Sequence, residues 1–141
     1  MIQEYLGKGT QGIKTALPDW EILHMEDPKT APDTLVLFDS RVFELARKGH
    51  YGQLDLGTGE TNDNLKKRYT AVRLTFKAGK TVNPTAGPTF LVLSYHGIKN
   101  GLGVTENSKW ENAKALVSAV GQEAFKSSIP ALIGGDWNTS R

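Results

Sequence analysis

Two short apolar segments of the chain each lead into side chains that can do chemistry. Phe90–Tyr95 is followed at once by His96. Ala131–Ile133 runs into Gly-Gly-Asp-Trp-Asn at positions 134–138. A histidine can act as a general acid or hold a phosphate, Asp136 can bind a metal ion or orient a water, and the asparagine amide can donate to a phosphate oxygen. The pentapeptide alone remains ambiguous, because Asp and Asn are also common in turns that follow strands.

The sequence between these segments predicts a helix that would bring their ends together. Apolar residues recur at helical spacing, and the helix is expected to end near Ser127, ahead of Pro130. The candidate caps of its first turn are Thr105, Asn107 and Ser108. Its expected buried stripe consists of Trp110, Ala113, Leu116, Val117, Val120 and Ala124. Strand, helix and strand form a βαβ unit with parallel strands, so His96 and Asp136 are expected at one edge of the sheet.

Two charged residues elsewhere in the chain are further candidates. Glu4 follows Ile2-Gln3 in a short predicted strand, and its carboxylate suits a hard cation such as Mg²⁺, which prefers oxygen ligands. Arg68 opens the alternating segment Tyr69–Phe76, and its fork of donors can contact a phosphate. Each residue can equally be a solvated charge at the end of a strand.

The rest of the chain predicts a mixed α/β fold of the α+β type with a substantial sheet. The segments expected to form further strands are Met1–Leu6, Trp20–Met25, Thr34–Phe38, Val42–Ala46 and Tyr51–Leu56. The 141 residues fit one domain, and we expect residues 1–141 to form a single unit. No internal repeat divides the chain.

Composition excludes several classes of protein. The chain has no cysteine, which rules out a disulfide scaffold, a thiolate zinc site and a cysteine nucleophile. Seventeen basic and fifteen acidic residues leave a net charge of +2, which argues against nucleic-acid binding through bulk charge but permits a local basic site. The apolar runs are too short to cross a bilayer, and no secretory signal is visible, so an intracellular location is expected.

The segment Gly7–Gly12 spells G-x-G-x-x-G and offers an alternative function, nucleotide binding. A dinucleotide site needs a helix after the glycines, but Pro18 leaves only residues 13–17 for it. The successive strands after Thr34 also lack the helices of a doubly wound sheet. We therefore favour a glycine-rich surface loop.

The order of the motifs resembles that of the endonuclease/exonuclease/phosphatase superfamily, which has the deoxyribonuclease I-like fold. The residues that carry the resemblance are Gln3-Glu4, Phe-Asp-Ser-Arg at 38–41, Arg68 with Ala71-Val72, Ser-Tyr-His-Gly at 94–97, and Gly-Asp-Trp-Asn at 135–138. The match runs from Gln3 to Asn138, and it departs from the usual Thr-His-Leu at Tyr95-His96-Gly97.

The resemblance implies a metal-dependent phosphodiester or phosphomonoester hydrolase. Glu4 would hold Mg²⁺ or Mn²⁺, and Asp136 would orient the attacking water or assist the metal. Asn138 and Arg68 would bind the phosphate, while His96 would support the scissile phosphate or the leaving oxygen. The superfamily acts on DNA, RNA, phosphoinositides and sphingomyelin, and the basic run that ends at Arg68 favours a nuclease-like activity on nucleic acid.

The resemblance also implies a fold larger than this chain, a four-layer α/β/β/α sandwich. Family members carry an Asn on a strand before the Gln-Glu pair and a C-terminal Asp-His pair. Here Met1 stands two residues before Gln3, and the sequence stops three residues after Asn138. We therefore expect part of the sandwich, without its first strand and C-terminal part, weak or absent hydrolysis, and self-association through an incomplete sheet. The alternative is a catalytically inactive relative that acts as a binding module.

Overall fold

The computed structural model describes residues 2–3, 10–23, 34–46, 68–79, 87–99 and 103–138. The elements within these ranges, in chain order, are β1 (Ile2–Gln3), α1 (Thr10–Ala16), β2 (Trp20–Leu23), β3 (Thr34–Asp39), β4 (Phe43–Leu45), β5 (Tyr69–Phe76), β6 (Thr89–His96), α3 (Glu106–Ser127) and β7 (Ala131–Asp136). Glu4, Gly7, Gly9 and the predicted strand Tyr51–Leu56 lie outside the described residues.

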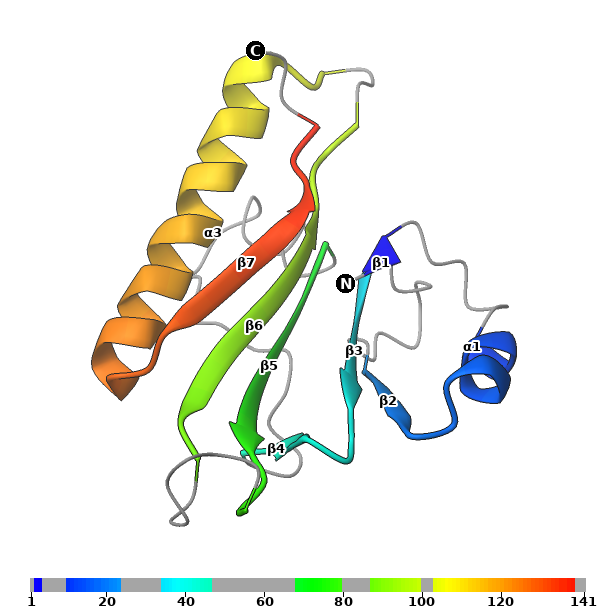
Figure 1. The fold of residues 1–141 in the computed structure, drawn as a ribbon. Coiled ribbons are helices and arrows are strands. Elements are labelled where there is room, and N and C mark those ends of the chain that lie inside the picture. The colour runs from blue at the N-terminus through cyan, green and yellow to red at the C-terminus, as the bar shows by residue number, and fades with distance from the viewer. Residues whose placement is uncertain are drawn as a thin grey trace.

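The described strands form two sheets. One has the order β1-β3-β2 and is antiparallel, and the other has the order β4-β5-β6-β7. In the second sheet β4, β5 and β6 are antiparallel neighbours, while β6 and β7 are parallel. Figure 1 shows this sheet between α3 on one side and the three-stranded sheet on the other. The chain therefore has a mixed α/β fold in layers, and the predicted parallel βαβ unit is confirmed.

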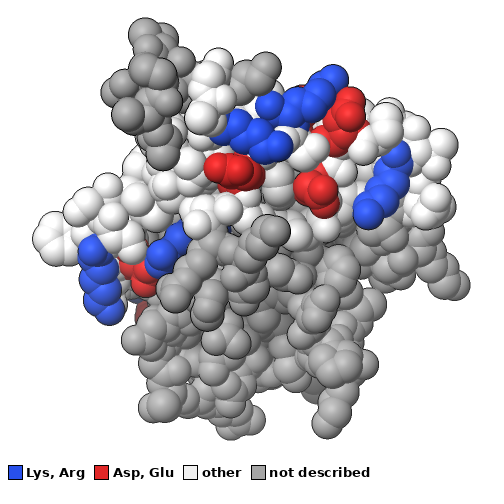
Figure 2. All heavy atoms as spheres, turned by 90° about the horizontal axis from the view of Figure 1, so that it is seen from below, with Lys and Arg blue, Asp and Glu red and all other residues white. Residues whose placement is uncertain are grey.

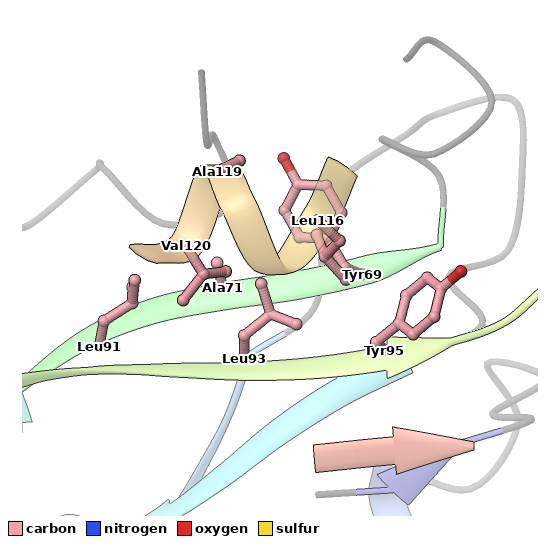
Figure 3. Packing of buried hydrophobic residues seen from close by; sticks show 8 residues of the cluster. All are labelled: Tyr69, Ala71, Leu91, Leu93, Tyr95, Leu116, Ala119 and Val120. Carbon is pink, nitrogen blue, oxygen red and sulfur yellow. The ribbon is translucent and has the colours of Figure 1, made fainter. Parts of the chain in front are cut away.

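Both faces of the central strands β5 and β6 are buried, because alternate residues of these strands pack against a different layer. One face packs against α3, and Figure 3 shows its cluster of Tyr69, Ala71, Leu91, Leu93, Tyr95, Leu116, Ala119 and Val120. The other face packs against β3 through Val36, Phe38, Val72, Leu74 and Val92. We call these the helix face and the inter-sheet face. Burial on both faces explains the almost continuous apolar run of β6.

Helix α3 is fixed at both ends by its capping residues. Thr105 is the N-cap and forms a capping box with Ser108, and Ser128 ends the helix with a left-handed φ of 50°. Of the three candidate caps the structure selects Thr105, and the predicted end of the helix is confirmed. An ion pair between Arg73 of β5 and Glu123 of α3 adds a polar link between the helix and the sheet.

The predicted buried stripe of α3 is wrong at two positions. Trp110 and Val117 are 52% and 48% exposed, because they stand about 100–120° round the helix from the fully buried Leu116. Lys109 and Asn112 are buried in their place. Both are partnered, since Lys109 Nζ donates to Glu106 Oε1 at 2.7 Å and Asn112 Nδ2 donates to the Ser108 carbonyl at 2.7 Å. Apolar periodicity alone does not detect buried polar side chains that bond within their own helix.

The strands that flank α1 are not neighbours in their sheet. β1 and β2, which precede and follow α1, run in the same direction, but β3 lies between them and pairs antiparallel with both. α1 has seven residues and contains Gly12. A dinucleotide fingerprint needs two adjacent parallel strands and a longer helix whose first turn faces the pyrophosphate, so this arrangement disfavours the nucleotide-binding alternative. Within the described ranges, neither helix has the length and apolar character needed to span a membrane.

Candidate functional site

The ends of β6 and β7 meet at Gly97. The parallel register places His96 beside Asp136, as the sequence predicts. Beyond this pair, the Gly97 N–H donates to the Asp136 carbonyl at 2.7 Å. A Cβ atom at Gly97 would lie 2.2 Å from the Trp137 carbonyl oxygen, far inside van der Waals contact. Glycine is therefore required for this close approach of the two strand ends.

Asn138 closes the junction with its side chain and its backbone. Its left-handed φ of 51° turns the chain, and its N–H donates to Asp136 Oδ1 at 3.0 Å. Its Nδ2 donates to the Gly97 carbonyl at 2.9 Å. Asparagine tolerates this backbone conformation better than most residues, which explains its place in the turn. The local fold thus orients both the Asp136 carboxylate and the Asn138 amide.

Arg68 reaches the same junction from β5. Its carbonyl accepts from the His96 N–H at 2.8 Å, and its Nη1 donates to the Gly97 carbonyl at 3.4 Å. The structure therefore brings four of the predicted site residues together around Gly97. We call this group of five, Arg68, His96, Gly97, Asp136 and Asn138, the Gly97 junction.

The inter-sheet face becomes polar as it approaches the junction. Thr70 Oγ1 donates to the Thr34 carbonyl at 2.9 Å and contacts Thr34 Oγ1 at 2.9 Å, which links β5 to β3. Ser94 lies opposite Thr70 in the ladder, and His96 follows on the same face of β6. All four side chains are buried, and His96 is only 4% exposed. Hydroxyl groups thus separate the apolar interior from the junction.

Tyr95 and Trp137 support the junction from the helix face. Their ring centroids lie 5.0 Å apart with an interplanar angle of 55°. Burial raises the pKa of Tyr95 above its ordinary value of 10.0, and the positive charge of Arg68 partly offsets this rise. The tryptophan of the pentapeptide therefore packs on the strand that carries His96, whereas the polar residues on either side of it face the junction.

Glu4 lies outside the described residues, so its place at the site stays a prediction. The strand before it runs toward the junction, because Gln3 pairs with Thr34 and Thr34 contacts Thr70. β1 also contacts β6 and β7.

Asp136 and Asn138 supply oxygen atoms of the kind that a hard cation prefers. The Asp136 carboxylate is exposed at the end of β7, and one of its oxygens accepts the Asn138 N–H. Mg²⁺ is commonly held by one or two carboxylates together with waters and substrate phosphates. The described part of the chain contains no cluster of three His, Asp or Glu side chains able to hold a metal ion. The donor set is consistent with a magnesium site that needs a further ligand such as Glu4.

A pocket lined by described residues lies at the other end of the sheets. It has a volume of about 420 Å³, an apolar wall that includes Leu23 and Phe43, and charged residues at Glu21, Glu44 and Lys77. Figure 2 looks at this end from below and shows basic and acidic side chains close to one another on its described surface. None of the candidate residues that the structure describes is among those that line this pocket.

Sequence reasoning identified the polar residues of the junction but missed the role of Gly97. A glycine directly after a buried apolar strand and a histidine is the signal that could have found it, since a second strand end can approach only there. Ser94 is a second such signal, because serine is mostly found on protein surfaces and here stands in a buried apolar strand.

Comparison with known proteins supports the fold. No protein-family model and no curated protein sequence matches the chain. Among solved structures, the chain is similar to the human Nocturnin catalytic domain with a bound sulfate anion, with a TM-score of 0.61 and 16% sequence identity. The match covers 99% of this chain and 49% of that domain, so the chain spans about half its length. The chain therefore has part of a deoxyribonuclease I-like fold, as its motifs predict.

Proposed function

We propose that the chain is a metal-dependent phosphodiester hydrolase of the endonuclease/exonuclease/phosphatase superfamily, with nuclease-like activity. The observation that carries the proposal is the Gly97 junction. It gathers Arg68, His96, Asp136 and Asn138 at the strand ends of a deoxyribonuclease I-like fold. Strand ends of this kind are where α/β proteins commonly place their chemistry.

Each residue of the junction has a chemical role in this proposal. Asp136 orients or deprotonates the attacking water, and its carboxylate is held for that task by the Asn138 N–H. Asn138 uses one amide proton on Gly97, which leaves the other for a phosphate oxygen. The charge of Arg68 and the imidazole of His96 support the scissile phosphate as negative charge develops on it.

Magnesium or manganese would be held by Asp136 and Glu4. When bound, the ion would supply electrostatic stabilisation of the phosphate. The phosphodiester substrate is proposed to be nucleic acid, for which the basic residues before Arg68 provide support. The sulfate in the Nocturnin structure shows that a protein of this fold accommodates a tetrahedral oxyanion.

The proposal is tested by Mg²⁺- or Mn²⁺-dependent cleavage of labelled single-stranded DNA and RNA. We expect slow cleavage that falls at least about 100-fold in Asp136→Asn. Asp39→Asn is the matched control, because Asp39 is a carboxylate at the far end of β3, bonded to Arg41. Cleavage that survives Asp136→Asn, or that Asp39→Asn abolishes equally, would contradict the assignment of the site.

A catalytically inactive binding module is the second candidate. The observation that favours it is that Arg68 and Asn138 meet at the Gly97 carbonyl and offer N–H donors to a phosphate without a metal ion. In that case the wild-type chain binds an oligonucleotide and Arg68→Ala weakens the binding, but neither metal ion produces cleavage. Turnover that depends on Asp136 would exclude this candidate.

A further inference from the structure

Ser94 lies at the centre of the polar part of the inter-sheet face. Its side chain is fully buried, and its Oγ has no hydrogen-bond partner in the part of the chain that the structure describes. A buried hydroxyl without a partner costs free energy, and such groups in folded proteins call for a bound water or a functional role. Val92, two residues earlier on the same face, shows that an apolar side chain fits this strand.

The neighbours of Ser94 show where a partner can approach. Thr70, opposite Ser94 on β5, donates its only hydroxyl proton to the Thr34 carbonyl, so that proton is not shared with Ser94. Gly134, opposite Ser94 on β7, has no side chain. The Ser94 hydroxyl therefore lies between the Thr70 hydroxyl, whose proton is already donated, and the backbone of Gly134. A polar surface of this kind suits a single internal water.

His96 is the group that such a water would reach. It follows Ser94 on the same face of β6, about 7 Å farther along the strand. This spacing suits one water that hydrogen-bonds to both side chains. The backbone of His96 is fixed by its N–H bond to Arg68, and the next residue is bonded to Asp136. The orientation of the imidazole ring, however, depends on contacts of the side chain itself.

We propose that Ser94 is a positioning residue of the Gly97 junction. Its hydroxyl binds one internal water, and this water holds the His96 ring in the orientation used for phosphate. The contact between Ser94, water and His96 is inferred from the burial of Ser94, its neighbours and the geometry of β6. Only the effect of this contact on the rate of hydrolysis rests on the proposed function.

The test uses Ser94→Thr and Ser94→Val. The threonine and valine side chains have the same shape, but threonine carries a hydroxyl where valine carries a methyl group. The side-chain nitrogen signals of the three histidines are recorded by NMR on the full chain, and His96→Gln assigns the His96 signals. We expect Ser94→Thr to keep the wild-type tautomer of His96 and Ser94→Val to change the tautomer populations. In the cleavage assay, Ser94→Val should lower kcat about tenfold with KM within about twofold, while Ser94→Thr retains the rate.

Identical His96 signals in the two variants would overturn the proposal, whatever their activity. If the branched side chains prevent folding, Ser94→Ala replaces them and is expected to change the same signals. A Ser94→Ala chain that is more stable than wild type, with unchanged His96 signals, would show that the hydroxyl holds no water. A wild-type chain without any cleavage, whose His96 signals still depend on the Ser94 hydroxyl, would support the contact and count against the proposed function.

Discussion

The two faces of the β4-β5-β6-β7 sheet are built from alternating residues of the same strands, yet they change differently along their length. The helix face stays apolar from Leu91 through Leu93 to Tyr95. The inter-sheet face changes along β6 from Val92 through Ser94 to His96, and it ends at the Gly97 junction.

This difference shows how two neighbouring strands serve two purposes. Because side chains alternate between faces, every second residue of β5 and β6 packs against α3 and holds the sheet in place. The residues between them lie on the inter-sheet face. They form an apolar core at the end away from the Gly97 junction and a polar group at the end near it. The site is thus built on rigid central strands rather than on loops alone, which keeps its side chains in a fixed geometry.

The largest expected effect on stability is at the centre of the helix face. Leu93 is fully buried, so Leu93→Ala should lower the free energy of unfolding by about 2–5 kcal/mol through lost burial and a cavity. Phe125→Ala is the control, since Phe125 is 86% exposed and its loss should change stability by less than about 0.5 kcal/mol. Urea denaturation measures both. Similar losses in the two variants would show that α3 does not cover this face.

The next effect is at the polar part of the inter-sheet face. Thr70→Val leaves the buried hydroxyl of Thr34 without its side-chain partner and should cost about 1–3 kcal/mol in urea denaturation. Thr75→Val breaks a similar pair with Thr89 at the other end of β5, where the pair is only part-buried, and should cost less. Equal costs would contradict the difference in burial between the two ends.

A smaller effect appears at alkaline pH on the helix face near the junction. The pKa of Tyr95 is raised in the folded state, mainly by burial, so above pH 10 the unfolded chain loses this proton first. The free energy of unfolding should then fall with rising pH, by at most about 1.4 kcal/mol per pH unit from this group. Measuring the free energy of unfolding of wild type and Tyr95→Phe between pH 8 and 11 isolates the contribution of the Tyr95 hydroxyl. Parallel pH profiles of the two proteins would refute the shift.

The smallest expected effect on stability concerns the edge of the inter-sheet face. Leu132 of β7 pairs in register with the buried Val92, yet it is 58% exposed, and among the described strands only β6 is hydrogen-bonded to β7. We propose that the chain self-associates through this edge. Leu132→Lys should lower the mass seen by light scattering while changing stability by less than about 0.5 kcal/mol. A wild-type chain that stays monomeric at high concentration would refute this proposal.

Much of the fold follows from the sequence because the patterns of its central strands are strong. The alternation of Tyr69–Phe76 predicts β5 with its observed bounds, and the order of strand, helix and strand predicts the parallel pair. The buried face of α3 was only partly predictable. The apolar character of Trp110 predicts that it is buried, whereas the burial of Lys109 is tolerated because Glu106, one turn earlier in the helix, pairs with it.

In the candidate site, too, some features follow from the sequence pattern and others depend on contacts that form only in the folded chain. His96 and Asp136 were placed together because parallel strands end at one edge of a sheet. The role of Gly97 depends on the distance between two strand ends, which spacing along the chain does not specify. The hydrogen bond from Arg68 likewise arises only when β5 pairs with β6 in its observed register.

The Gly97 carbonyl accepts hydrogen bonds from both Asn138 and Arg68, and this shared acceptor has an energetic consequence. Two donors on one oxygen compete for its electron density, and loss of one lets the other shorten its bond. The effects of removing the two side chains should therefore not add. A double-mutant cycle on this pair would measure their coupling energy, which pairwise contacts alone do not give.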